Sequence, residues 1–354
     1  MCKVTVVIPN YNGIRFLRDC LDAILDQDPD TPEYEVLVVD NGSEDGSLAL
    51  LREVYIREYA STDYGSPEGD ASGQALECRA PGDRPRVRVE ALPENTGFCH
   101  AVNVGIGLSD SPYVILLNND TKVKSAFIKS LCYAIEKRPE AFSVSARMLM
   151  WDNPELIDDA GDRYCVFGWG YARGKGKPAE QYSLPCEVFA ACAGAAIYRR
   201  SILEEIGSFD EEHFAYMEDL DIGYRARIYG YRNYYEPGAE VIHYGSASSG
   251  SRYNEWKTVL AAANNIYVVG KNMPLLQRIW NLPFLLAGFG VKFIFFCKKG
   301  MGRAYVKGFG KGFTRLFSAG GRAHKVRFRF KHLKNYLAIQ GQLYLNVFRF
   351  LKKT

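Results

Sequence analysis

The chain has 354 residues, 47% hydrophobic and 13% aromatic, so it can form a large core and is neither disordered nor fibrous. Its net charge of +3 conceals an asymmetry: residues 256–354 carry nineteen Lys or Arg and no acid, which leaves 25 basic and 41 acidic residues before them. We therefore expect two surfaces of opposite charge.

Strand-like and helix-like segments alternate from residue 1 to about residue 135. Apolar runs typical of buried strands and amphipathic segments typical of helices follow one another, with strands at 4–9, 35–40, 87–92 and 113–118 and helices near 14–26, 44–58, 98–108 and 124–138. This alternation predicts an α/β fold with a mostly parallel sheet flanked by helices. Ligands of such sheets bind at the carboxyl ends of the strands, where all four runs end in polar or turn residues.

Two later stretches depart from this regularity. Residues 59–86 are rich in Gly, Pro, Ser and Asp without periodicity, which predicts a mobile surface insertion. After about residue 150 the sequence is richer in aromatics and glycine, as expected for loops that shape a second pocket.

The nine cysteines are scattered and form no C-x-x-C pair. This pattern favours neither a zinc site nor a disulfide framework and fits a reducing cytosol. The first residues, MCKVTVVIPNYNG, run directly into a predicted strand, so we expect no secretory signal.

The second strand leads into the segment VVDNGSEDGS (38–47). A strand, a glycine turn and a helix with Ser43 as N-cap would explain Gly42 and Ser43. That interpretation leaves Asp40 unexplained. The alternative is that the Asp40 carboxylate accepts hydrogen bonds from a base or a ribose.

Asp120 follows the fourth strand in LLNNDT (116–121). It either closes an Asx-turn or binds a divalent cation. A single carboxylate suffices for the second role, because Mg²⁺ or Mn²⁺ can hold a diphosphate through one or two protein carboxylates, with phosphate and water as the other ligands.

Three acids crowd the start of a predicted helix in FAYMEDLDIGYRARIYGY (214–231). Arg225 stands four positions after Asp221, so the two can form an ion pair within the helix, and Asp221 can have a structural role. Asp219 has no such partner, and beside Glu218 and Asp221 its pKa should be raised, which suits a general base. Stabilisation of the helix dipole by first-turn acids is the alternative.

His243 ends a further strand-like run in GAEVIHYGSASSG (238–250), 24 positions after Asp219. A single histidine is usually a structural residue. Its place before a small-residue loop also allows a metal or phosphate contact.

These motifs, taken together, resemble the inverting family 2 glycosyltransferases of the GT-A fold, in particular the branch with rhamnosyl- and galactofuranosyltransferases. The resemblance covers roughly residues 3–250 and is carried by VVIPNYNG, VVDNGSEDGS, NTGFCHAVNVGI, LLNNDT, GAAIYRR, FDEEHFAYMEDLDIGYRARIYGY and VIHYGSASS. It implies a nucleotide-sugar glycosyltransferase domain over 1–250, and the composition of residues 251–354 predicts a helical, basic C-terminal region.

The resemblance also implies residue roles. The donor nucleotide and its diphosphate would contact Pro9, Asn10, Tyr11, Asp40, Gly42, Asn95, Gly97, Asn118, Asn119, Asp120 and Arg225. Asp120 would be the surviving acid of the D-x-D metal motif, Asn118 stands where the first Asp is common, and His243 would be a second ligand of Mg²⁺ or Mn²⁺. Glu218, Asp221 and Arg225 would shape the acceptor site or support the base.

The implied mechanism is inverting transfer. Asp219 would remove a proton from an acceptor hydroxyl, which attacks the anomeric carbon in line with the departing nucleoside diphosphate. The donor would be a dTDP- or UDP-linked rhamnose or other hexose. The acceptor would be a polyprenyl-linked saccharide used in cell-surface polysaccharide synthesis.

Two other classes of protein remain open. A sugar-phosphate nucleotidyltransferase would carry a Gly-rich loop with Arg and Lys after the first strand, and IPNYNGIRF lacks that loop. A non-catalytic scaffold that binds nucleotide sugars at a membrane would bind the donor without releasing a nucleoside diphosphate.

The C-terminal region combines apolar and basic segments. The run IWNLPFLLAGFGVKFIFF (279–296) has 18 residues and contains Pro283 and Lys292, which favours an interfacial segment over a spanning helix. With the basic, aromatic sequence after it, this run predicts peripheral association with the inner face of the cytoplasmic membrane. Nucleic-acid binding is disfavoured because no known module is present, and a solvated or partner-bound helix pair is the remaining alternative.

Overall fold

The computed structural model describes residues 3–58, 76–78, 86–245 and 253–352. The predicted mobility of 59–86 thus falls almost wholly outside the described residues. The strands are β1 (Val4–Asn10), β2 (Tyr34–Asn41), β3 (Leu76–Cys78), β4 (Arg86–Leu92), β5 (Tyr113–Leu117), β6 (Thr121–Val123), β7 (Ala141–Met150), β8 (Ile157–Asp159), β9 (Asp162–Tyr164), β10 (Gly170–Ala172), β11 (Cys186–Val188), β12 (Ala195–Arg199) and β13 (Arg232–His243).

The helices are named in the same way. The α-helices are α1 (Ile14–Leu25), α2 (Ser47–Leu50), α3 (Phe98–Gly107), α4 (Phe127–Glu136), α5 (Arg200–Ile206), α6 (Glu218–Tyr229), α7 (Glu255–Asn272), α8 (Leu275–Lys298), α9 (Gly302–Phe317), α10 (Ala319–Ala323) and α11 (Leu333–Leu351). The shorter elements are η1 (Leu51–Glu58), η2 (Ala179–Tyr182), η3 (Glu211–His213) and η4 (Phe330–His332).

The predicted α/β fold class is confirmed. The central sheet has the strand order β11-β13-β7-β12-β5-β1-β2-β4-β3, and β1, β2, β4 and β5 pair in parallel, as their alternation with helices requires. The irregular sequence after residue 150 supplies antiparallel pairs, with β12 set between β5 and β7. The sheet is therefore mixed, with one parallel part formed by the first strands and a second parallel pair formed by β7 and β13.

Helices cover both faces of this sheet. On one face α1 and α4 bury apolar side chains against β1, β2 and β5, in a cluster that includes Leu17, Ile24 and Phe127. On the other face α3 and α5 do the same through Val102, Ile106 and other residues. Because the first strands are buried on both faces, their sequences read as continuous apolar runs.

The predicted helix near 44–58 begins later and is irregular. Its first turn is α2, which starts at Ser47 with Gly46 as N-cap, and it continues as the π-helical η1. The prediction that Ser43 is the N-cap is therefore wrong. The Ser43 hydroxyl instead accepts hydrogen bonds from Asn10 Nδ2 (3.1 Å) and the Asn12 backbone N–H (2.9 Å).

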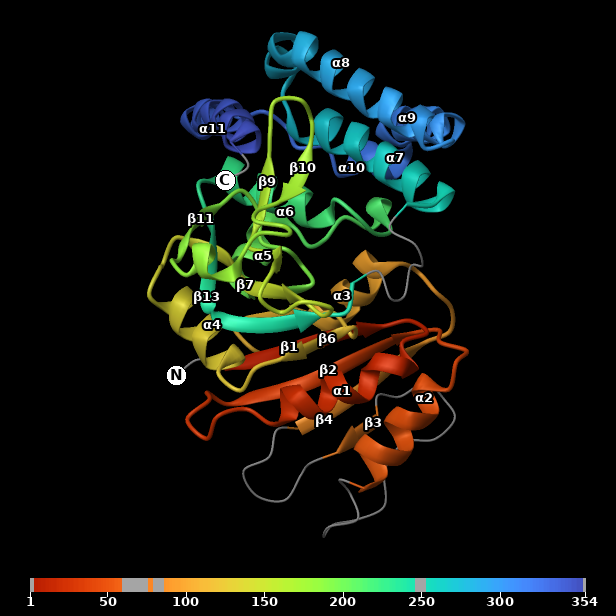
Figure 1. The fold of residues 1–354 in the computed structure, drawn as a ribbon, viewed down its shortest axis with the longest axis vertical. Helices are drawn as coiled ribbons and strands as arrows, with labels where there is room; N and C mark the ends of the chain where they lie inside the picture. The colour runs from red at the N-terminus through yellow and green to blue at the C-terminus, as the bar shows by residue number, and fades with distance from the viewer. Residues whose placement is uncertain (1–2, 59–75, 79–85, 246–252, 353–354) are drawn as a thin grey trace.

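Helices α7 to α11 gather at one end of the molecule, opposite the end with α2 and β3 (Figure 1). They share a hydrophobic cluster with the sheet-bearing part, in which Leu220 and Tyr224 of α6 pack with Ile266, Leu285 and Ile339. The helical C-terminal region is thus present, and it packs against α6 through a common core. Pro283 lies inside α8 without ending it.

Candidate active site

A cavity of about 950 Å³ opens at the carboxyl ends of β1 and β5, beside the start of α6. Predicted residues that line it are Pro9, Asn10, Tyr11, Asn95, Asn118, Asn119, Asp120, Glu218, Asp219 and His243. Among the lining residues that sequence analysis missed are Asn254, Trp256 and Lys257, which lie at the start of the C-terminal helices. The strand-end residues and the acids of α6 therefore meet in one place.

Asn10 lies at the centre of a buried hydrogen-bond chain on one wall of this cavity. Its Nδ2 donates to Asp40 Oδ2 (2.7 Å), and its Oδ1 accepts from Asn119 Nδ2 (2.6 Å). Asp40 is 1% exposed, and its Oδ1 accepts from the Ser43 backbone N–H (3.0 Å). Asp40 is thus placed to orient Asn10, behind the wall rather than on it.

Two predicted glycines act through the backbone. Gly42 has φ of 72°, and a Cβ there would lie 2.6 Å from Glu94 Cα. Gly97 has φ of 91°, and a Cβ there would lie 2.6 Å from the Phe214 ring. Both positions need glycine for conformation and for close approach. They let the loop that carries Asn95 pack against β2 and the segment before α6.

The two predicted metal ligands face each other. Thr121 of β6 pairs with His243 of β13, so Asp120 Oδ1 lies 3.4 Å from His243 Nε2. The other ring nitrogen, Nδ1, lies 2.7 Å from Asp158 Oδ2, and Asp158 also pairs with Lys175 Nζ at 2.5 Å. Sequence analysis missed Asp158, whose carboxylate fixes the orientation of the imidazole.

The charges around His243 determine its protonation. Burial by itself lowers the pKa of His243, but the bonds and charges of Asp120 and Asp158 outweigh burial and raise that pKa to about 9. A carboxylate and an imidazole, 7% and 16% exposed at the cavity wall, are a donor set that fits a divalent cation. A metal bound there would have to displace the His243 proton.

Glu218 and Asp219 begin α6 and reach the cavity. Burial, followed by the charge of Asp219, raises the pKa of Glu218 to about 8, and Glu218 Oε2 has no hydrogen-bond partner among the described residues. Burial also raises the pKa of Asp219, in the direction predicted from sequence, although Asp219 Oδ1 accepts from the Leu220 backbone N–H (2.6 Å). Glu218 and Asp219 are therefore not both ionised at neutral pH.

Two more buried acids support this pair from the segment that sequence analysis left unassigned. Burial raises the pKa of Asp159 to about 7 and that of Asp162 as well, and both carboxylates lie with the Cys192 thiol within 4.8 Å of one another. The repeated acids in ELIDDAGDRY were the available signal.

The backbone before α6 is held in a rare conformation. Phe214, Tyr216 and Met217 have φ of 60°, 68° and 70°, a region that non-glycine residues seldom occupy, at about 1–3 kcal/mol each. The Nδ2 of Asn264 in α7 secures this segment by donating, at 2.7–3.0 Å, to the carbonyl oxygens of His213, Ala215 and Tyr216. This segment leads directly into Glu218 and Asp219, which line the cavity from the start of α6.

Asp221 and Arg225 point away from this cavity, contrary to their expected part in it. The predicted i,i+4 pair forms, with Arg225 Nε 3.0 Å from Asp221 Oδ2, and Asp221 also accepts from Lys271 Nζ (2.7 Å) and Asn272 Nδ2 (2.8 Å). Burial acts to raise the pKa of Asp221, but Lys271 and Arg225 hold it well below its usual value. The bonds from Lys271 and Asn272 to Asp221 fasten α7 to α6.

The fold and the cavity define the class of protein. A mixed α/β sheet flanked by helices, with a polar cavity at the carboxyl ends of β1 and β5, is the GT-A fold of glycosyltransferases. A solved structure of GalNAc-T7 with UDP, GalNAc and Mn²⁺ has this fold, with a TM-score of 0.56, 17% identity and coverage of 77% of this chain and 48% of that chain. At that identity the likeness shows the fold alone.

The chain belongs to glycosyl transferase family 2, whose profile matches residues 5–207. It is 29% identical over 199 residues to the N-acetylglucosaminyl-diphospho-decaprenol L-rhamnosyltransferase of Mycobacterium tuberculosis, covering 47% of this chain and 61% of the relative. It is 23% identical over 268 residues to the rhamnosyltransferase WbbL of Escherichia coli, covering 71% and 87%.

A third relative is the uncharacterized protein y4gI of Sinorhizobium fredii. The chain is 27% identical to it over 259 residues, or 70% of this chain and 25% of the relative. The chain therefore spans a quarter of this relative and about three-fifths of the mycobacterial one.

Proposed function

We propose that this protein transfers a hexose, with rhamnose as the first candidate, from a nucleoside-diphosphate sugar to a hydroxyl of a lipid-linked saccharide, with inversion at the anomeric carbon. The names of two relatives, both rhamnosyltransferases, support rhamnose, and the name of the mycobacterial one also supports a lipid-linked acceptor. The observation that carries the proposal is the meeting of the pair Asp120 and His243 with the acids of α6 in one cavity.

The donor would occupy the strand-end side of the cavity. Pro9, Tyr11 and Asn95 would contact its nucleotide. Asn10 and Asn119 are held ready for it, because Asn10 donates to Asp40 and accepts from Asn119. Because Asn10 and Asn119 are already fixed in the protein, little side-chain ordering would be needed on binding.

Asp120 and His243 would hold the divalent cation, with Asp158 orienting the imidazole. An imidazole ligand suits Mn²⁺ better than Mg²⁺, which prefers oxygen ligands alone. When bound, the metal would supply positive charge to the leaving diphosphate. Because Asn118 stands where a second acid would be, Asp120 is the one carboxylate that the segment LLNNDT would offer to the metal.

Asp219 would be the general base. With a pKa of about 8, Glu218 stays protonated at neutral pH, which leaves Asp219 as the acid of this pair able to ionise. Asp219 would then take the proton from the acceptor hydroxyl as that oxygen attacks the anomeric carbon. The protonated Glu218 would keep a second negative charge away from the base.

We also propose that the protein is peripheral on the inner face of the cytoplasmic membrane. α8 is long and apolar enough to span a membrane, and only 22% of its most apolar 18-residue stretch is buried in the protein. Its buried face is fixed to the protein, since Trp169 Nε1 donates to the Gly288 carbonyl (3.0 Å) and Asn281 bonds Gln340 (2.9 Å). Polar contacts along its middle favour a helix lying on the membrane over one surrounded by lipid.

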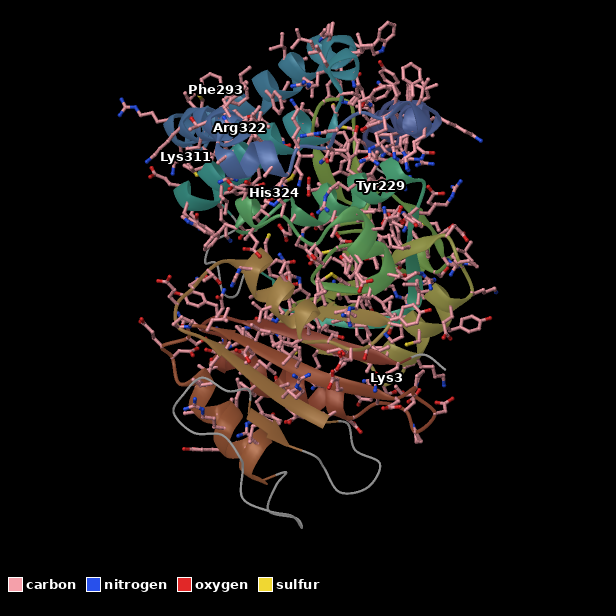
Figure 2. All side chains as sticks on the ribbon, turned by 180° about the vertical axis from the view of Figure 1, so that it is seen from behind. Lys3, Tyr229, Phe293, Lys311, Arg322 and His324 are labelled. Carbon is pink, nitrogen blue, oxygen red and sulfur yellow. The ribbon has the colours of Figure 1, made fainter. Side chains whose placement is uncertain are left out.

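The exposed surface of the C-terminal helices would supply the membrane contact. Figure 2 shows Phe293, Lys311 and Arg322 together on the C-terminal helices, away from Lys3. Exposed apolar side chains on α8 and α11 include Leu276, Trp280, Leu337, Phe348 and Leu351.

A donor screen tests the function. The full-length protein is incubated with UDP- and dTDP-linked hexoses, Mn²⁺ and a polyprenyl-diphosphate saccharide, and released nucleotide and product anomer are measured. Nucleoside diphosphate with an inverted product supports the proposal. Release of pyrophosphate from a nucleoside triphosphate would indicate a nucleotidyltransferase, and donor binding without release would indicate a scaffold.

A further inference from the structure

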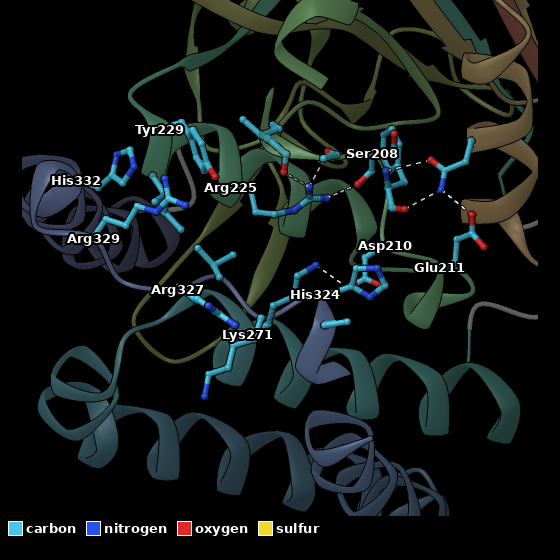
Figure 3. Close-up of a pocket in the computed structure, with 18 residues that line it drawn as sticks. Ser208, Asp210, Glu211, Arg225, Tyr229, Lys271, His324, Arg327, Arg329 and His332 are labelled. Carbon is cyan, nitrogen blue, oxygen red and sulfur yellow. Dashed lines mark hydrogen bonds and ion pairs between the residues drawn. The ribbon is translucent and has the colours of Figure 1, made fainter. Parts of the chain in front are cut away.

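A second cavity, of about 820 Å³, lies between α6 and the segment that joins α10 to η4. The described residues that line it include none of those that line the catalytic cavity. Its walls come from the end of α5, the second half of α6 and residues 323–332 (Figure 3). Nothing in the proposed transfer reaction uses it.

The acids of this second cavity are already paired. Asp210 binds Lys271 Nζ (2.6 Å) and His324 Nδ1 (3.1 Å), and Glu211 binds His100 Nδ1 (2.9 Å) and Asn103 Nδ2 (2.9 Å). Lys271 and His324 are thus already engaged by Asp210, and both acids have partners without the other cations of the cavity.

Three cations remain on the opposite side. Lys325, Arg327 and Arg329 line the cavity, and in the described part of the chain no carboxylate lies within ion-pair distance of them. Figure 3 shows Arg329 and His332 next to Tyr229, at the end of the cavity away from Glu211. This end therefore has a surplus of positive charge.

His332 adds a buried donor or acceptor without a partner. It is 7% exposed and lies against Tyr229, with ring centroids 5.0 Å apart, yet its Nε2 makes no hydrogen bond with any described residue. A buried polar atom without a partner costs about 1–3 kcal/mol, so its retention at a cationic cavity points to a ligand.

Residues 325–330, which lead from α10 into η4, combine basic and aromatic side chains. Lys325, Arg327 and Arg329 line the cavity, whereas Phe328 and Phe330 between and after them are 43% and 82% exposed. Val326 also lines the cavity, and the Phe328 ring packs against those of Phe330 and Tyr336, with centroids 5.7 and 5.6 Å apart, so this segment carries cations along the cavity and exposed aromatic rings beside it. An anionic lipid fits this surface, because its phosphate would bind the cations at the cavity while its acyl chains contact the exposed aromatic rings.

We propose that this cavity binds the phosphate headgroup of an anionic membrane lipid. Arg327 and Arg329 pair with the phosphate oxygens, His332 Nε2 provides a further hydrogen bond, and Phe328 and Phe330 enter the acyl region. The headgroup is a docking ligand and not the sugar acceptor, because this cavity and the catalytic one are lined by different residues. The inference rests on the membrane association proposed above and gives it a specific site.

The test compares two double variants of equal charge with vesicles of phosphatidylcholine, with and without phosphatidic acid. R327Q/R329Q removes cavity cations, whereas K331Q/K334Q removes exposed cations of the same region that do not line the cavity. Diffuse attraction would weaken both to the same extent, by roughly fivefold per charge. We expect R327Q/R329Q to bind phosphatidic-acid vesicles at least roughly tenfold more weakly than the control, as lost charged hydrogen bonds imply.

H332F keeps the ring against Tyr229 and removes Nε2, so it guards against a folding effect of the double variant. We expect it to weaken binding to phosphatidic-acid vesicles with an unchanged melting temperature. Equal weakening of the two double variants would overturn the headgroup site alone, and failure of the wild type to bind any vesicle would overturn the membrane proposal with it. Inorganic phosphate that raises the melting temperature of the wild type, while vesicle binding is the same in both double variants, would assign the cavity to free phosphate and refute the lipid.

Discussion

Replacing Asp158 by alanine tests the proposed metal site through a residue that would not touch the metal. Asp158 holds His243 Nδ1 at 2.7 Å, and loss of such a carboxylate partner typically weakens metal binding by about 10–100-fold. Lys175→Ala is the matched control, because it removes the other partner of Asp158 and leaves the histidine bond intact.

The pKa of His243 makes the expected loss depend on pH. In the wild type this pKa is about 9, so at pH 7 a proton competes with the metal. Asp158→Ala removes one of the charges that raise the pKa, which weakens that competition and partly offsets the loss of orientation at pH 7. Above pH 9 the histidine is neutral in both proteins, so the full roughly 10–100-fold deficit should appear there.

The assay is Mn²⁺ titration followed by electron paramagnetic resonance, without oxygen, at pH 7 and above pH 9, in the presence of nucleoside diphosphate. We expect a deficit of Asp158→Ala that grows with pH, and little change in Lys175→Ala. Equal Mn²⁺ affinity of Asp158→Ala and the wild type at both pH values would refute the assignment of His243 as a ligand.

Three further predictions concern stability, pH and the membrane. Lys271→Met should lower the free energy of unfolding by about 3–5 kcal/mol in urea titrations, because it leaves buried Asp210 and Asp221 without their shared cation; a loss under about 1 kcal/mol would contradict the role of this network. Glu218→Gln should leave the acidic limb of the pH profile of kcat/KM in place, because Glu218, with a pKa of about 8, is already protonated and uncharged over that range; a clear shift of that limb would indicate that Glu218 and not Asp219 is the titrating base. The full-length protein should sediment with membranes and be released at least in part by carbonate or high salt, because exposed charges are screened over about 8–10 Å; resistance to both washes would indicate a spanning α8.

The sequence was most informative where a pattern is local. Apolar runs predicted β1, β2 and β5 to within a residue or two, because strands buried on both faces show little else, and the segment VRVEAL predicted β4 equally well. The polar residues that follow β1 and β5, including Asn10 and Asp120, were predicted to meet for the same reason, since parallel strands end at one edge.

The sequence was least informative where a role depends on distant partners. Asp158 and Asn264 lie 85 and 51 positions from the residues they orient, His243 and His213, and a single sequence shows no such pairing. The i,i+4 spacing found the bond between Asp221 and Arg225, but the position of both outside the catalytic cavity follows from Lys271, 50 residues away. Helix spacing alone could not indicate which side of α6 faces the ligand.

The central claim is that Asp219 is the base of a glycosyl transfer, and Asp219→Asn tests it most directly. Transfer to a polyprenyl-linked acceptor is measured in single turnovers, with donor affinity measured separately and Asp110→Asn, an exposed acid, as control. The account predicts that Asp219→Asn slows transfer by roughly 10²–10⁴-fold while donor affinity stays within a few-fold, because the base acts on the acceptor. Transfer by Asp219→Asn at a rate near that of the wild type would contradict it.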